Sequence, residues 1–305
     1  MDPRRLGIPG SDDWIDVTTL TKGFSSDRKF TITTRHRGSF LLRLFELSQH
    51  DRKLEEYRVM NRLVEAGIRV NRPIDIGPCN DHQNGYLLCE WIEGEDLEAV
   101  LPHLSRTDQA LLGAQAGHLL AHVHQCAPLH PLSDWASHFN AKIDRKIAKA
   151  LACPVDIPGR DKLIETLNAD RHLLNHRPIT LHHGDFHVGN LLIQPDGQLA
   201  LIDLNRFDAG DPWEEFNRIV WDVAVSPVFA SARINAYFPH GISDNFFPLL
   251  RLYIASNALS SVPWAIPFGD AEVQVMQNQL RDIQSWYDGM TRIIPSWYIP
   301  KENGS

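Results

Sequence analysis

The order of hydrophobic and polar positions divides this chain of 305 residues into a strand-rich first part and a helix-rich remainder. Phe30, Ile32 and Thr34 follow one another at the two-residue period of a β-strand. Residues 17–34 are therefore predicted to be two strands joined by a polar turn. Short apolar runs predict three further strands, at residues 40–45, 70–77 and 85–91.

The helical pattern is clearest over residues 51–66, where apolar side chains recur at spacings of three and four and Gly67 follows as a stop signal. Near Gly94 the pattern changes from strands to helices. We therefore expect an N-terminal domain of residues 1–92 and a C-terminal domain of residues 93–305. Within the second domain, helices are predicted at residues 108–125, 135–152 and 160–174, with two or three more across residues 216–290.

Charge and composition narrow the classes of function. The formal net charge of −8 argues against nucleic-acid or acidic-membrane binding and is compatible with a cationic partner. The four cysteines lack the paired spacing of a zinc site or a disulfide framework, and no stretch reaches about 18 apolar residues. These features predict a soluble, cytoplasmic protein, and no feature of the sequence bears on its oligomeric state.

The stretch from His182 to Asp211 concentrates the candidate chemistry. Its two apolar runs flank Asp196-Gly197, a dipeptide that favours a type I′ hairpin with a two-residue loop. In that register Asn190 lies opposite Asp203, and directly opposed side chains are about 5 Å apart at Cβ. An amide oxygen and a carboxylate oxygen are suitable ligands for Mg²⁺, which also binds the phosphates of a substrate. Asp185, on the preceding loop, could orient a hydroxyl nucleophile.

The motifs HGDFHVGN and LIDLNRFDAGDP in this stretch resemble those of the aminoglycoside phosphotransferase and choline kinase superfamily, small-molecule relatives of the protein kinases. The resemblance implies that Asp185 is the catalytic carboxylate and that Asn190 and Asp203 are metal ligands. It implies an α+β, two-lobed protein-kinase-like fold: an N-terminal antiparallel sheet with one helix, and a larger, mainly helical C-terminal lobe.

The resemblance also assigns residues to nucleotide binding. The segment KGFSSDRKF takes the place of the phosphate-covering loop, with Ser25 and Ser26 in place of glycines. Arg43 stands where the family usually has lysine; it either holds phosphates and pairs with a helix glutamate or lies on a solvated strand face. Glu56 is the expected partner of Arg43, with Glu55 as the alternative. Backbone groups of Glu90, Trp91 and Ile92 are expected to contact the nucleotide base.

Residues 216–290 are expected to build the acceptor pocket. The turn Asp211-Pro212-Trp213-Glu214 has the form of a capping box, and Glu215 stands where the family has aspartate. Candidate contacts to an aromatic or cationic acceptor are Trp213, Trp221, Trp264, Asp222, Asp244 and Asp270.

The leading hypothesis is therefore an Mg²⁺-dependent transfer of the γ-phosphate of ATP or GTP to a hydroxyl of a small molecule, such as an aminoglycoside antibiotic. Two alternatives keep the fold: a protein serine/threonine kinase and a non-catalytic nucleotide-binding protein. A third takes His182, His183, Asp185 and His187 as ligands of a hydrolytic zinc or di-iron centre.

Overall fold

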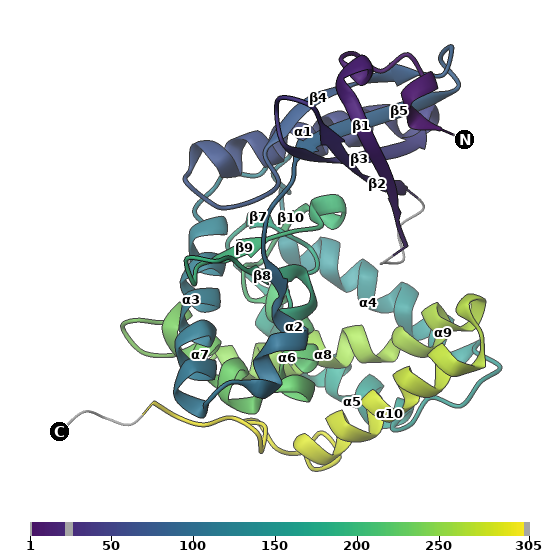
Figure 1. The fold of residues 1–305 in the computed structure, drawn as a ribbon. Helices are drawn as coiled ribbons and strands as arrows, with labels where there is room; N and C mark the ends of the chain where they lie inside the picture. Colours follow the sequence, from purple (N-terminus) through teal and green to yellow (C-terminus); the bar gives the residue numbers. More distant parts are fainter. Residues whose placement is uncertain (1, 22–26, 302–305) are drawn as a thin grey trace. The chain divides into compact units, whose positions relative to one another are not determined.

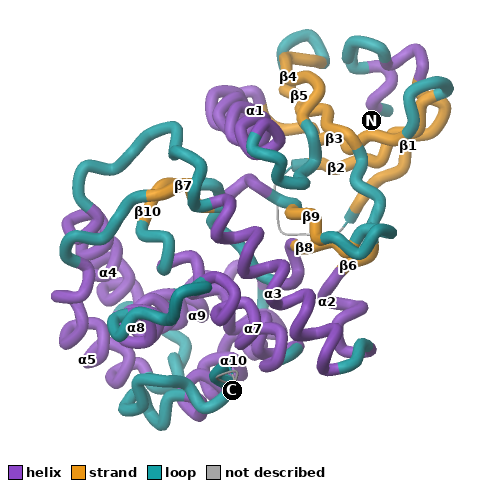
Figure 2. Tube along the Cα trace, turned by 90° about the vertical axis from the view of Figure 1, so that its left-hand side faces the viewer, coloured by secondary structure: helices purple, strands orange, loops and turns teal. Residues whose placement is uncertain are grey.

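The computed structural model describes residues 2–21 and 27–301. They form two compact units: unit 1 contains Met1–Asp96 and Asn190–Phe207, and unit 2 contains Leu97–Gly189 and Asp208–Ser305 (Figure 1). Compared with the expected division after Ile92, unit 1 also includes the short segment up to Asp96 and the hairpin that begins at Asn190. Most of the strands belong to unit 1 and most of the helices to unit 2; the labelled exceptions in Figure 2 are α1 in unit 1 and β7 and β10 in unit 2.

Unit 1 is built on a five-stranded antiparallel sheet. Each predicted strand is present, and Lys29 pairs directly with Arg43 across the two neighbouring strands β2 and β3. The sheet order is β1 (Trp14–Leu20), β2 (Arg28–Thr34), β3 (Ser39–Glu46), β5 (Asn84–Glu90) and β4 (Pro73–Cys79).

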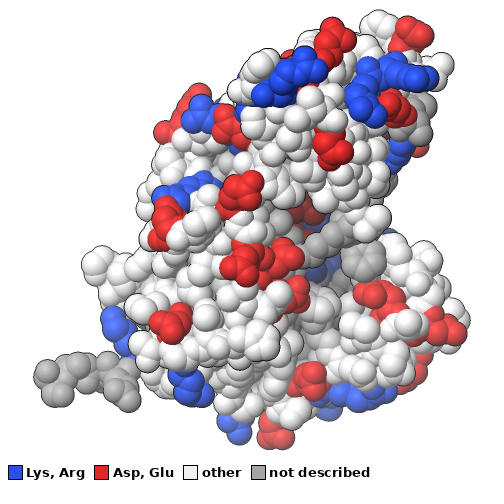
Figure 3. Space-filling view, viewed as in Figure 1, with Lys and Arg blue, Asp and Glu red and all other residues white. Residues whose placement is uncertain are grey.

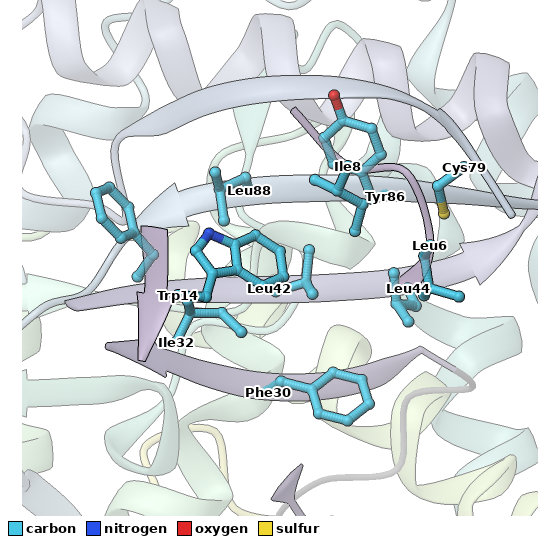
Figure 4. Packing of buried hydrophobic residues seen from close by; sticks show 11 residues of the cluster. Leu6, Ile8, Trp14, Phe30, Ile32, Leu42, Leu44, Cys79, Tyr86 and Leu88 are labelled. Carbon is cyan, nitrogen blue, oxygen red and sulfur yellow. The ribbon is translucent and has the colours of Figure 1, made fainter. Parts of the chain in front are cut away.

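The two faces of this sheet are different in character because side chains alternate along each strand. On one face Phe30, Ile32, Leu42 and Leu88 join Trp14 in a buried hydrophobic cluster (Figure 4). The other face carries Lys29 and Arg43. There α1 (His50–Glu65), the predicted helix, contacts β4 and β5 and places charged side chains against Arg43.

A second, three-stranded sheet of unit 1 contains the hairpin that follows Asn190. It consists of β6 (Glu95–Asp96), β8 (Leu191–Ile193) and β9 (Leu199–Leu201), and Leu201 also forms a parallel bridge with Val70. The pairing of β6 with β8 explains why the chain up to Asp96 belongs to unit 1.

The predicted register of this hairpin is wrong by one residue. Leu191 pairs with Leu201, and the Gln194 N–H donates to the Gln198 carbonyl, which leaves a three-residue loop of residues 195–197. Gly197 alone in this loop has positive φ, at 78°, whereas a type I′ turn requires two such residues. Asn190 therefore lies opposite Ile202, whose N–H donates to the Asn190 carbonyl, and Asp203 follows one position later.

Unit 2 is mainly helical, with one short strand pair, β7 (Thr180–His182) and β10 (Asp208–Gly210). The three predicted helices before residue 180 are present. Residues 216–290, all of which the structure describes, contain five α-helices rather than two or three. The α-helices are α2 (Leu97–Val100), α3 (Arg106–Val123), α4 (Trp135–Leu151), α5 (Arg160–Asp170), α6 (Ile219–Val225), α7 (Pro227–Tyr237), α8 (Phe246–Leu259), α9 (Ser261–Ala265) and α10 (Asp270–Trp286).

The surface carries charges of both signs. On the face drawn in Figure 3, acidic and basic side chains are interspersed among uncharged ones and form no large basic patch. Over the two described ranges, no helix has both the length and the apolar content needed to cross a membrane.

Candidate active site

In unit 2, Asp185 lies on the loop that follows β7, directly after Gly184, whose φ of 85° favours glycine. The Asp185 side chain is 22% exposed, and Arg218 Nε lies 3.0 Å from its Oδ1. This contact is an ion pair without the angles of a hydrogen bond. His187 Nε2 lies 3.9 Å from the same oxygen. Burial lowers the pKa of His187 to about 4 despite the Asp185 charge, so this imidazole is neutral near pH 7.

Glu215 holds the backbone of this loop. Its Oε2 accepts the His183 N–H at 2.8 Å and its Oε1 accepts the Gly184 N–H at 2.5 Å. His124 Nε2 lies 3.3 Å from Oε2, and its Nδ1 lies 2.8 Å from the Tyr237 hydroxyl. Burial would raise the pKa of Glu215, but the hydrogen bond with His124 and the nearby histidines lower it to about 2. Glu215 is therefore an anion, and it holds the backbone N–H groups of the two residues before Asp185 in place.

Asp222 holds the other end of the loop. Its Oδ1 accepts the Val188 N–H at 2.7 Å, and its Oδ2 pairs with Arg233, whose guanidinium stacks on the rings of Phe186 and Phe216. Burial raises the pKa of Asp222 even though Arg233 opposes the shift. Asp222 was one of six candidates for contact with the acceptor; its side chain is fully buried, and these contacts occupy both of its oxygens.

Asp211 fixes the strand pair from which the loop leaves. Its carboxylate accepts hydrogen bonds from Arg177 at 2.6 and 3.0 Å, from the Tyr253 hydroxyl at 2.5 Å and from the Trp213 N–H at 3.0 Å. The predicted capping box is wrong. The Glu214 N–H donates to the Asp211 backbone carbonyl, and the 3₁₀-helix Glu214–Arg218 has Trp213 at its N-cap without a side-chain cap hydrogen bond.

The histidines of the motif contact the backbone around the loop. His182 Nε2 lies 2.8 Å from the Asp211 carbonyl oxygen, and His183 Nδ1 accepts the Asp185 N–H at 3.2 Å. Throughout the described part of the chain, no group of three or more His, Cys, Asp or Glu side chains is arranged to hold a metal ion. The contacts of His182 and His183 support the backbone of the loop. Residues 2–21 and 27–301 contain no ligand cluster for the zinc or di-iron alternative.

In unit 1, Asn190 and Asp203 lie at the end of the β8–β9 hairpin that is remote from its turn. Asp203 has left-handed backbone angles, φ 63° and ψ 59°, which are uncommon for a residue other than glycine and occur at functional sites. Its Oδ1 is buried and has no hydrogen-bond donor in the described ranges, whereas its Oδ2 lies 3.5 Å from Lys29 Nζ.

This donor set fits a hard divalent cation. Mg²⁺ prefers carboxylate and amide oxygens and uses only one or two protein ligands beside phosphates and water. A buried carboxylate oxygen without a donor costs about 1–3 kcal/mol, which a cation would offset. Asn190 and Asp203 are therefore suited to holding such an ion, with the Asp203 Oδ1 atom as its clearest attachment point.

Arg43 belongs to a buried cluster of four charged side chains. It pairs with Glu56 as predicted, through Nη1 and Oε1. Its Nε and Nη2 donate to one oxygen of Asp27 at 2.9 and 2.6 Å. Lys53 bridges the same two carboxylates, at 2.6 Å from Asp27 and 3.2 Å from Glu56. Burial would lower the pKa of Arg43, but the two carboxylates raise it. The solvated alternative for Arg43 is wrong.

The remaining nucleotide-binding predictions have different outcomes. Ser25 and Ser26 lie outside the described residues. The Glu90 N–H donates to Arg72 O at 2.8 Å, the Glu90 carbonyl accepts from Asn71, and the Trp91 N–H donates to Ser39 O at 3.1 Å. Of the three predicted residues, Ile92 is thus the one whose backbone N–H is not used by these contacts.

Sequence reasoning missed several residues that shape the site. It gave no role to Asp27, Lys53, Arg218 or Arg233, and it could not evaluate Glu215. The role of Lys53 could have been predicted from one feature of the sequence: it precedes Glu56 by three residues, so the two side chains lie on the same face of α1. The others contact partners that are distant in sequence, and no local pattern marks them.

Together these observations define a class. An antiparallel sheet with a buried cation–glutamate pair, and a mainly helical unit with a carboxylate on a braced loop, make up a two-lobed protein-kinase-like fold. Residues 16–246 match the model of the APH family, described as the phosphotransferase enzyme family. The chain belongs to this family.

Solved structures agree on the fold. A GDP complex of aminoglycoside 2′-phosphotransferase IIIa has a TM-score of 0.71 at 15% identity, covering 91% of this chain and 94% of that chain. A ternary complex of a thermostable aminoglycoside phosphotransferase APH(4)-Ia with AMP-PNP and hygromycin B has a TM-score of 0.68 at 17% identity, with coverages of 88% and 93%. A choline/ethanolamine kinase family protein from Mesorhizobium loti has a TM-score of 0.67 at 16% identity, with 94% of each chain covered.

A curated relative is the acyl-CoA dehydrogenase family member 10 of Mus musculus, 23% identical over 201 residues. The match covers 62% of this chain and 18% of that protein, so the chain spans about a fifth of the relative's length.

Proposed function

We propose that this protein transfers the γ-phosphoryl group of ATP or GTP to a hydroxyl group of a small molecule, with Mg²⁺ as the cofactor. The observation that carries the proposal is the Asp203 carboxylate, whose Oδ1 is buried without a donor in the described ranges and whose backbone is held in an uncommon conformation. Membership of a phosphotransferase family supports the same reaction.

Asn190 and Asp203 would hold the metal ion. When bound, Mg²⁺ neutralises charge on the phosphates. In the reaction, a bond forms between the acceptor oxygen and the γ-phosphorus, and the bond from that phosphorus to the oxygen bridging it to the β-phosphate breaks. The products are a phosphate ester and a nucleoside diphosphate.

Asp185 would orient the acceptor hydroxyl and accept its proton. Its position depends on Glu215 and Asp222, which hold the backbone on both sides of it, and positioning of this kind supplies much of the catalysis in phosphoryl transfer. Because burial lowers the pKa of His187 to about 4, that ring is neutral and adds no positive charge beside Asp185 at neutral pH.

Both nucleotides are reasonable co-substrates. Structures of similar fold contain AMP-PNP in one case and GDP in another. Contact with the base is assigned to the backbone of Glu90, Trp91 and Ile92, with the Ile92 N–H as the donor that the contacts described above leave unused. Backbone groups would not discriminate strongly between adenine and guanine by side-chain chemistry.

Three classes of hydroxyl compound are candidate acceptors for an activity assay. They include aminoglycosides, because one structure of similar fold contains hygromycin B, and amino alcohols, because another belongs to the choline/ethanolamine kinase family. They also include hydroxy acids, because the Arg218 guanidinium beside Asp185 would attract an acceptor anion.

The test is an assay of ADP or GDP release with these three classes of acceptor, comparing the wild type with Asp185→Asn, Asp203→Asn and the surface control Asp161→Asn. The first two should lower kcat by about 100-fold or more, and the control should not. Wild-type turnover in Asp185→Asn would contradict the assignment. Nucleotide binding without transfer to any acceptor would favour the non-catalytic alternative, and transfer to proteins alone would favour the protein kinase alternative.

A further inference from the structure

We propose that Lys29, rather than Arg43, is the side chain of β2 and β3 that contacts the nucleotide phosphates. This inference rests on the proposed function, since it requires a bound nucleoside phosphate. The family resemblance instead suggests that Arg43, the cation of β3, contacts the phosphates.

Arg43 is committed to contacts within unit 1. Three of its N–H groups donate to Asp27 and Glu56, and its side chain is 5% exposed. Lys53 is held by the same carboxylates, so two cations and two carboxylates cancel within the cluster. A phosphate would therefore have to compete with two buried carboxylates for the Arg43 guanidinium.

Lys29 lies on the same face of the sheet and one strand further out. It pairs directly with Arg43 across β2 and β3, and directly opposed residues point to the same face. Its side chain is 16% exposed, about three times as much as that of Arg43. An ammonium group placed there is more accessible to an anion than the buried guanidinium.

Lys29 also lies beside the candidate metal ligand. Its Nζ is 3.5 Å from Asp203 Oδ2, a distance for an ion pair that is longer than those inside the Arg43 cluster. A divalent cation on Asp203 would repel the ammonium, while the phosphates that accompany the cation would attract it. Lys29 would therefore neutralise Asp203 in the absence of metal and turn to the phosphates when metal and nucleotide bind.

This exchange makes two predictions of opposite sign for Lys29→Met. Binding of ADP without metal should weaken by about 10- to 100-fold, because one charge-assisted hydrogen bond is lost. Binding of Mn²⁺ without nucleotide should tighten, because the cation that competes for Asp203 is removed. A purely structural role for Lys29 would weaken both.

The experiment measures ADP and GDP binding by titration calorimetry and Mn²⁺ binding by electron paramagnetic resonance. Lys29→Arg should retain most of the affinity for ADP. Arg28→Met is the matched control, because Arg28 is the preceding residue of β2, points to the opposite face and stacks on Phe30.

Wild-type affinity for ADP in Lys29→Met would overturn this inference alone. Weaker binding of both ADP and Mn²⁺ in that variant would also overturn it, in favour of a structural role. If the wild-type protein binds neither ADP nor GDP, with or without metal, the proposed function fails and the inference fails with it. Weaker ADP binding together with tighter Mn²⁺ binding would support it.

Discussion

Replacement of Glu215 with glutamine tests whether catalysis depends on the anchored loop. The change keeps the shape of the side chain but removes its charge and turns one acceptor oxygen into an NH₂ donor. That donor would face the His183 N–H or the Gly184 N–H, so one buried donor loses its partner. A charge-assisted hydrogen bond contributes about 1.5–3 kcal/mol, and an unsatisfied buried group costs about 1–3 kcal/mol. We expect a loss of about 3–5 kcal/mol.

The pH dependence gives a second measure of the same interaction. The pKa of Glu215 is lowered from 4.5 to about 2, and a lowered carboxyl pKa stabilises the fold above the unfolded-state pKa. This contribution is about 3 kcal/mol at neutral pH and is lost as the pH falls from about 4.5 towards 2. The difference in stability between the wild type and Glu215→Gln should therefore shrink over that interval.

The assay combines chemical unfolding, followed by circular dichroism between pH 2 and 7, with steady-state kinetics. We expect kcat to fall while KM for the nucleotide stays within about twofold, because the side chains assigned to phosphate and metal belong to unit 1. Glu214→Gln is the matched control, since the Glu214 side chain contacts Lys142 and also His182 at the end of β7. Glu215 instead accepts the N–H groups of His183 and Gly184. If Glu215→Gln were no less stable than this control and turned over at the wild-type rate, the loop argument would be refuted.

Two further predictions concern unit 1. Arg43→Met should lower the free energy of unfolding by about 3–5 kcal/mol, because it leaves two buried carboxylates with Lys53 as their remaining partner in this cluster. Urea unfolding measures the loss, and a change below about 1 kcal/mol would contradict the prediction. Asp203→Asn should unfold near the wild-type temperature in a chelator, because loss of the ion pair with Lys29 is offset by removal of a partly buried negative charge. Only the wild type should be stabilised further by Mg²⁺ in thermal scans, and equal stabilisation of both proteins would count against the metal assignment.

The elements of unit 1 were predicted because their signals are local. The β2 strand and the helix before Gly67 follow from the spacing of apolar residues, and β3, β4 and β5 follow from short apolar runs. The pairing of Arg43 with Glu56 was predicted from the family resemblance and is confirmed. The cluster around that pair was not predicted, because Asp27 and Lys53 look like ordinary polar residues until the chain brings them together.

The register of the hairpin shows a limit of short motifs. Asp-Gly is compatible with a two-residue loop and with a three-residue loop in which glycine alone takes positive φ. Here Asp196 accepts the Gln198 N–H and pairs with Arg69, which also donates to Gln194. Arg69 lies more than 120 residues earlier in the chain, so the contact that accompanies the three-residue loop is not visible in the hairpin sequence.

The buried carboxylates fall into two groups, according to whether their oxygens accept hydrogen bonds. Glu215, Asp222 and Asp211 each accept a backbone N–H and also have a side-chain partner, which is the pattern of a structural brace. The partners are His124 for Glu215, Arg233 for Asp222, and Arg177 and Tyr253 for Asp211. Among the residues that the structure describes, Asp203 has the carboxylate oxygen that is buried without a donor. Such an atom lowers the stability of the fold, since an apolar group of similar shape in its place would avoid the cost of an unsatisfied buried acceptor. One Asp203 oxygen without a donor in the described ranges, beside a second oxygen that Lys29 contacts, is the arrangement that the proposed site for a metal ion and phosphates predicts.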